Sequence, residues 1–268
     1  MSEINLNYNL HVIGNPNYCR SLANMRTFTN FFDITGGVDY YLDCPNDDFR
    51  LSSVLFKSRN PEEVIQIGHE LVELFNSLNK LLFPTNFRRL PLVIDEILNN
   101  DEVLNYSLEK KKDFKLFNSH YISNKVDIES DLSELIKNNN NIFGLLLLSF
   151  VREDIYVLLK LISNLNDKEE DWTQLYKIFE SLKNFSKITN IDTNFDKKIL
   201  EELKKSSNNF SISGINSRHG FVNSNNVQSV IDYTEAKNHI LYCSKLYLFK
   251  SMDLVKTQDK IESIILIK

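Results

Sequence analysis

The sequence predicts an α+β protein, with an N-terminal antiparallel sheet packed against one long helix and a C-terminal bundle of helices. Near the N-terminus apolar and polar residues alternate with a period of two, which is typical of a strand with one buried face. Beyond residue 127 the apolar residues recur with the 3.6-residue period of a helix. Hydrophobic residues make up 42% of the 268 residues, enough for a sizeable core. We therefore expect a β-rich domain over residues 1–126 and a helical domain, with a short terminal strand, over residues 127–268.

The N-terminal part of the sequence indicates four strands. Residues 27–34 and 38–43 flank Gly36-Gly37. Because glycine readily adopts positive φ, we expect a hairpin at this pair. Residues 49–56 are expected to form a fourth strand. The first strand is expected over residues 4–12, whose alternate positions are apolar: Ile4, Leu6, Tyr8, Leu10 and Val12.

A strong helix start follows at residues 60–63. Asn60 can accept a hydrogen bond from an amide of the first turn, and Pro61 suits the first helical position. Glu62 and Glu63 lie near the positive end of the helix dipole. One apolar face then persists for about six turns before Pro84 ends the helix. This face consists of Val64, Ile67, Leu71, Leu74, Leu78 and Leu81.

The remaining elements complete the sheet and build the bundle. Residues 92–97 and 114–122 can extend the sheet as two strands joined by the charged turn 109–113. Residues 261–267 are expected to form an apolar strand that returns to a sheet edge or pairs with another subunit. The helical half is expected to begin with a short helix over 128–137, followed by the asparagine run 138–141. Four longer helices are expected after it, at 142–165, 172–185, 195–205 and 227–252.

Charge and cysteine content restrict the class of protein. A net charge of −5 argues against a protein whose whole surface binds nucleic acid, although a local basic groove stays possible. Cys19, Cys44 and Cys243 lie far apart, which fits reduced thiols. The first residues lack the pattern of a signal peptide. The most apolar run, 142–150, is shorter than the ~20 residues of a membrane span. We expect a soluble, cytoplasmic protein that makes no contact with a membrane.

Two sets of residues could imitate metal sites. His69 and Glu73 lie one helical turn apart, but the zinc-protease motif needs a second histidine where this chain has Glu73. Asp95, Glu109 and Lys111 could imitate a magnesium-dependent nuclease. The Glu-x-Lys spacing also occurs at Glu202 and Lys204, as is expected by chance in a chain rich in lysine and glutamate. We favour solvated surfaces for both sets and expect no metal and no cofactor.

The segment Arg218-His219-Gly220 is the remaining candidate for chemistry. Histidine transfers protons near neutral pH, and arginine holds a phosphate with a planar fork. Together they could bind an anion or assist RNA cleavage, with Trp172, Tyr176 and Lys177 as candidate contacts to nucleic acid. The structural alternative, which we favour, is that Arg218 and His219 cap neighbouring helices and bond acids such as Asp154, Asp171 or Glu180.

The last third of the chain resembles a widespread group of uncharacterised bacterial proteins. The resemblance implies no established activity. The helical layout is also similar to HEPN-type domains, whose RNases use an arginine and a histidine a few residues apart. Here Arg218 and His219 are adjacent, which departs from that pattern. The matching residues are Asp171, Trp172, Leu175, Tyr176, Lys177, Ile178, Glu180, Arg218, His219, Gly220, Glu235 and Ala236.

These observations lead to two functional hypotheses. The first is a non-enzymatic protein that acts by protein–protein contact or self-association, as a subunit or inhibitor in a phage–host conflict system. The asparagine-rich composition is the basis for expecting a bacterial or phage origin, and open sheet edges can add a partner strand. The second is a HEPN-like protein that binds nucleic acid or cleaves RNA with Arg218 and His219.

Overall fold

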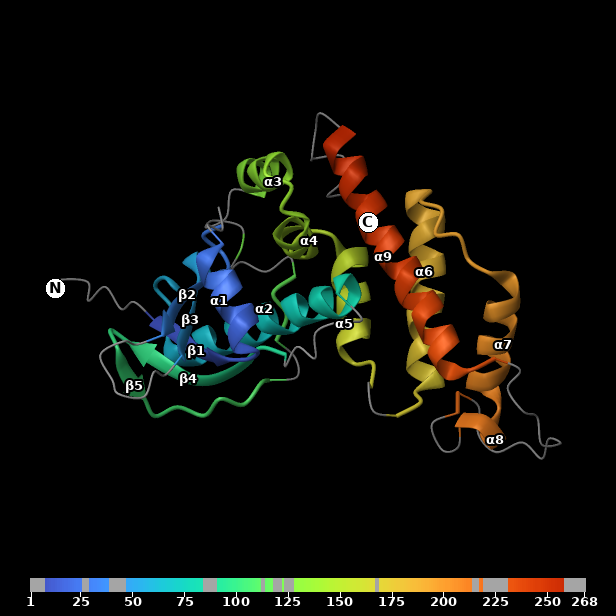
Figure 1. Ribbon diagram of the computed structural model, residues 1–268, viewed down its shortest axis with the longest axis horizontal. Coiled ribbons are helices and arrows are strands. Elements are labelled where there is room, and N and C mark those ends of the chain that lie inside the picture. Colours follow the sequence, from blue (N-terminus) through green and yellow to red (C-terminus); the bar gives the residue numbers. More distant parts are fainter. Residues whose placement is uncertain are drawn as a thin grey trace. The chain divides into compact units, whose positions relative to one another are not determined.

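The computed structural model describes residues 8–25, 29–38, 47–83, 91–111, 114–117, 122, 128–166, 169–213, 217–218 and 231–257. The fold is α+β, as predicted, with a five-stranded antiparallel sheet followed by helices (Figure 1). The chain divides into two compact units between Glu153 and Asp154, and Lys80–Leu82 count with the second unit. The boundary expected at 126/127 falls within residues 123–127, which are outside the described residues.

The sheet has the strand order β2-β3-β1-β4-β5, with every neighbouring pair antiparallel. The alternation that predicted the first strand is confirmed for its described part, where Tyr8, Leu10 and Val12 are buried. The strands are β1 (Tyr8–Ile13), β2 (Asp33–Val38), β3 (Asp47–Ser52), β4 (Val93–Asn99) and β5 (Glu102–Leu104).

The hairpin expected at Gly36-Gly37 is wrong. Both glycines lie inside β2, where Gly36 pairs with Phe49 and Gly37 with Asp48. Gly36 has φ +102°, and a Cβ there would lie 1.8 Å from the carbonyl oxygen of Asp48. The glycine is therefore needed for close approach of β3 and not for a turn. The second strand of that hairpin, expected at 38–43, lies outside the described residues beyond Val38.

A helix, α1 (Pro16–Asn24), follows β1 in a segment for which no helix was expected. The Asn15 side chain accepts a hydrogen bond from the amide of Tyr18 (3.2 Å), and Pro16 lies in the first turn. Cys19 and Leu22 are buried. The proline therefore begins a helix here, as it does at Pro61.

The long helix α2 (Pro61–Leu82) begins as predicted. The Asn60 side chain accepts a hydrogen bond from the amide of Glu63 (2.9 Å), and the Glu63 carboxylate accepts one from the amide of Asn60 (3.2 Å). This reciprocal capping box satisfies two amides of the first turn. A short 3₁₀ turn (Val54–Phe56) precedes the helix, where the sequence predicted the end of a strand.

The segment 105–111 does not lead into the second strand that was expected after the charged turn 109–113. Described residues 114–117 and 122 are not in a strand, and 118–121 lie outside the description. The segment is instead bound along α2 by polar side chains. The Gln66 side chain donates to the carbonyl of Glu109 (2.7 Å) and accepts from the amide of Lys111 (2.6 Å). Because these α2 residues satisfy its backbone, the segment needs no sheet neighbour.

Helices α3 (Ile128–Lys137) and α4 (Asn141–Ser149) complete the first unit. The sequence predicted α3 with the same bounds. The single helix expected over 142–165 is two helices, α4 and α5 (Glu153–Ser163). The acids Glu153 and Asp154 suit a new helix N-terminus, so the chain breaks just before them.

The second unit is helical, as predicted. Tyr247 donates a hydrogen bond to the buried Asp154 of α5. Asp171 caps α6 by accepting from the amide of Gln174 (2.9 Å), and Asn190 ends that helix in the left-handed conformation. None of the helices in the described ranges combines the length and the apolarity that a membrane span needs. The strand expected at 261–267 lies outside those ranges. The helices after α5 are α6 (Trp172–Thr189), α7 (Lys197–Asn208), α8 (Phe210–Ser213) and α9 (Tyr233–Thr257).

Candidate functional site on the outer face of the sheet

The two faces of the sheet differ in what covers them. A Cβ placed on Gly68 of α2 would lie 2.0 Å from Leu10 Cδ1 and 3.1 Å from Ile94 Cδ1. Helix α2 therefore packs on the face to which Leu10 and Ile94 point, which we call the inner face. Because successive residues of a strand point to opposite sides, His11 of β1 belongs to the other face, the outer face.

A β-bulge in β4 changes what the outer face presents. His11 pairs with Glu96, whereas the next residue of β1, Val12, pairs with Ile94. Asp95 is thus an additional residue without a partner on β1. In a regular strand Asp95 and Glu96 would point to opposite faces. The bulge instead places two residues of β4 opposite His11 and aims both carboxylates toward its side of the sheet.

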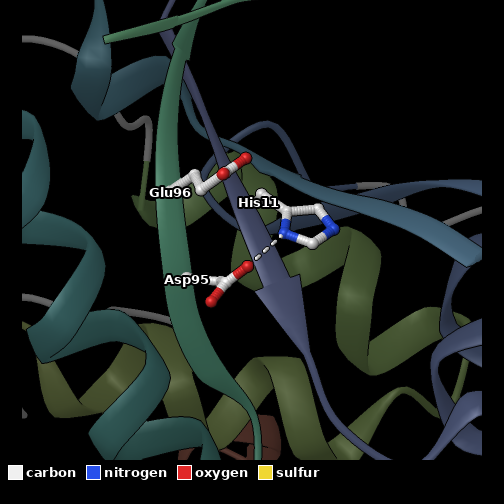
Figure 2. A group of neighbouring side chains, drawn as sticks. All are labelled: His11, Asp95 and Glu96. Carbon is white, nitrogen blue, oxygen red and sulfur yellow. Dashed lines mark hydrogen bonds and ion pairs between the residues drawn. The ribbon is translucent and has the colours of Figure 1, made fainter. Parts of the chain in front are cut away.

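The result is a compact group of three side chains, the His11–Asp95–Glu96 cluster (Figure 2). The ligand atoms of these residues, one from each, all lie within 4.8 Å of one another. The imidazole Nδ1 of His11 is 3.1 Å from Oδ2 of Asp95. The His11 side chain is 19% exposed and that of Asp95 48%, so solvent reaches the cluster. One imidazole and two carboxylates can hold a proton or a divalent cation.

A second charged group lies beside the cluster on the same face. Arg50 of β3 pairs across the sheet with His11, yet its guanidinium binds the carboxylates of Asp48 (2.7 Å) and Asp101. The hydrogen bonds that its guanidinium donates to these carboxylates, first to Asp48, raise the pKa of Arg50 above its ordinary value. The arginine is therefore fixed away from the cluster, and Asp95 and Glu96 have no lysine or arginine partner among the described residues.

Apolar and polar surfaces flank the cluster along the strands. Ile13 and Val93 are register partners one row further on, and they are 47% and 48% exposed. In the other direction lies the uncharged Asn9, whose side-chain oxygen accepts a hydrogen bond from the Ser52 hydroxyl (2.8 Å). Asn9 and Ser52 also line a hollow of about 440 Å³, together with Asp33 and Lys57.

The structure separates Asp95 from the two residues with which the nuclease hypothesis grouped it. Glu109 and Lys111 are held by Gln66 of α2, on the inner side of the sheet. The Lys111 ammonium binds the carboxylate of Glu62 (3.1 Å). Asp95 instead lies on the outer face beside His11. The expected combination of a magnesium site and a phosphate-binding lysine is therefore not formed.

His69 and Glu73 are likewise engaged in structure. Nε2 of His69 lies 2.6 Å from the carbonyl oxygen of Leu108, to which it donates as an N–H. Burial lowers the pKa of His69, which favours the neutral imidazole. Lys110 binds both Glu73 and the fully buried Glu70. These residues hold the segment 105–111 on α2.

Arg218 makes the kind of contact that the structural interpretation expects. Its guanidinium lies 3.2 Å from the carboxylate of Glu180 and 5.0 Å from the ring centre of Tyr176. Its amide donates to the carbonyl of Ser207 (2.9 Å). Arg218 thus joins α6 to α7 inside the second unit. His219 and Gly220 lie outside the described residues.

The three residues proposed to contact nucleic acid differ in exposure. Trp172 is 2% and Tyr176 6% exposed, whereas Lys177 is exposed. The indole of Trp172 packs edge-on against Tyr233, and its N–H donates to Glu170 (3.1 Å). Burial raises the pKa of Tyr176. Stacking a base on Trp172 or Tyr176 would therefore require the packing of α6 to open.

Sequence reasoning missed His11 and Glu96, because both occupy polar positions of ordinary amphipathic strands. One signal was present. Ile94 and Ile97 are both buried although they are three residues apart, which breaks the period of two and is typical of a bulge. This signal does not indicate which strand pairs with β4. Comparison with family models, with curated proteins and with solved structures found no match for the chain.

Proposed function

We propose that the protein is a binding protein that recognises a basic segment of a partner protein with the outer face of its sheet. The observation that carries this proposal is the charge of that face. Asp33, Asp48, Asp95 and Glu96 share it, with Arg50 among them and Lys57 beside Asp33 in the adjoining hollow. Arg50 is itself bound by two carboxylates. The face is therefore acidic and attracts positively charged groups.

Apolar surface on the same face supports a protein partner in particular. The half-exposed pair Ile13 and Val93 offers a contact that a small ion does not need and that a polypeptide side chain can cover. An acidic surface repels the phosphates of nucleic acid, and the net charge of −5 acts in the same direction. The nucleic-acid alternative stays a prediction. Among its described residues in the second unit, Trp172 and Tyr176 are buried, Arg218 is bound to Glu180, and Lys177 is exposed.

Affinity purification with charge-matched variants tests the proposal. The Asp33→Asn/Asp48→Asn variant removes two charges from the outer face without changing His11, Asp95 or Glu96. The control, Glu201→Gln/Glu235→Gln, removes the same charge from exposed positions in the second unit. Purified proteins are immobilised and exposed to an extract of the source organism, and the bound proteins are identified by mass spectrometry.

The expected result is a basic protein that the wild type and the control retain, that the sheet variant loses, and that salt releases. A set of retained proteins that is the same for all three baits would contradict the proposal. Light scattering on the wild type alone provides the second readout. A stable dimer that the sheet variant converts to a monomer would identify a second copy of the chain, and not a basic partner, as the occupant of the face.

A further inference from the structure

We infer that the His11–Asp95–Glu96 cluster is a binding site for a divalent first-row transition-metal ion of the zinc type. This inference goes beyond the proposed function and does not depend on it. The cluster supplies one imidazole nitrogen and two carboxylate oxygens, which are the N and O ligands found in zinc sites that keep an open coordination position. Magnesium is less suited, because it favours oxygen ligands alone.

The distances within the cluster are close to those of a coordination sphere. Ligand atoms about 2.1 Å from a tetrahedral metal ion lie about 3.4 Å from one another, and those of an octahedral ion about 3.0 Å. The His11 Nδ1 and Asp95 Oδ2 atoms are already 3.1 Å apart. Because no pair of ligand atoms exceeds 4.8 Å, the widest pair needs to close by at most about 1.4 Å to reach the tetrahedral edge. Rotation about the side-chain bonds of the half-buried Glu96 can supply this movement.

Charge gives a second, independent reason for a cation at this position. Asp95 and Glu96 are adjacent in sequence and the bulge brings both carboxylates to one side, where like charges repel. The arginine nearest in register, Arg50, is held by Asp48 and Asp101 and does not neutralise them. Glu96 has no hydrogen-bond or ion-pair partner among the residues that the structure describes. A bound dication would neutralise both carboxylates at once.

Isothermal titration calorimetry with zinc chloride, and separately with magnesium chloride, tests the inference on the full chain. We expect one zinc ion per chain and weaker binding of magnesium. His11→Asn, Asp95→Asn and Glu96→Gln each remove one ligand with little change in shape. Each should weaken zinc binding by at least about tenfold. The control Glu102→Gln removes an exposed acid of β5 that is outside the cluster and should leave the affinity unchanged.

Cobalt provides a readout that does not depend on the heat of binding. Cobalt(II) bound by an imidazole and two carboxylates absorbs visible light, and the absorption should be lost in the His11→Asn variant. Thermal unfolding of each variant in the absence of metal, equal to that of the wild type, shows that the loss is local. The inference is overturned if the wild type binds no zinc, if it binds magnesium as tightly as zinc, or if zinc binding survives in all three cluster variants.

Discussion

The packing of α2 on the inner face of the sheet, opposite the His11–Asp95–Glu96 cluster, can be tested at Gly68. A Cβ at this position would lie 2.0 Å from Leu10 Cδ1, and Leu10 is fully buried. Overpacking of this kind costs about 1–3 kcal/mol. Replacing glycine by alanine inside a helix returns about 1 kcal/mol. Gly68→Ala should therefore lower the free energy of unfolding by up to about 2 kcal/mol.

A double-mutant cycle with Leu10→Val separates the clash from other effects of the substitution. Valine lacks the Cδ1 atom, and the next Leu10 atom, Cγ, lies at an ordinary contact distance of 3.5 Å from the new Cβ. The contact with Ile94 Cδ1 at 3.1 Å remains, and this side-chain end needs to shift by only a few tenths of an ångström. In the Leu10→Val background Gly68→Ala should be neutral or stabilising, with a coupling of about 1–3 kcal/mol. Urea unfolding followed by circular dichroism measures all four proteins. If Gly68→Ala alone stabilises the protein by about 1 kcal/mol, as at an open helical position, α2 does not approach the sheet in this way.

Three further predictions follow from the same structure. Burial lowers the pKa of His69 below 6.5, so the unfolded state takes up a proton first as the pH falls. The free energy of unfolding at about pH 7.5 should therefore decline at about pH 5.5. His69→Gln should flatten this pH dependence, measured by urea unfolding. Burial raises the pKa of Cys19 and of Cys243 to about 11, so in a Cys44→Ser protein both should react with Ellman's reagent more than about 100-fold slower than in denaturant; fast labelling of the native protein would refute their burial. Asn60→Ala removes the capping box and should cost about 1 kcal/mol in the same unfolding assay, whereas Asn60→Asp should cost less.

Local signals predicted those parts of the fold that depend on neighbouring residues. The Asn60-Pro61 cap, the bounds of α3 and the α+β class with a helical C-terminal part were all predicted, because caps and periodicity act over a few residues. The hairpin at Gly36-Gly37 was wrong for a related reason. A glycine pair is compatible with a turn and with a close contact between strands. In this chain the nearby carbonyl of Asp48 on β3 shows that the contact between strands requires the glycine.

The candidate site could not be predicted in the same way, because it depends on pairing between distant segments. Nothing near His11 in the sequence indicates that residue 95 or 96 lies opposite. The register and the bulge of β4 create that proximity. Asp95 was singled out from the sequence, but with Glu109 and Lys111, which the polar side chains of α2 hold elsewhere.

The most direct test of the outer face as a ligand site is nuclear magnetic resonance of the isotope-labelled full chain during titration with cobalt(II). The paramagnetic ion shifts and broadens the signals of nearby amides. A metal ion in the cluster predicts that the amides of His11, Arg50, Asp95 and Glu96 respond first and together. Those of α2, which covers the opposite face, should respond later and less. Early effects on α2 or on the second unit, with the β1 and β4 signals unchanged, would contradict the site.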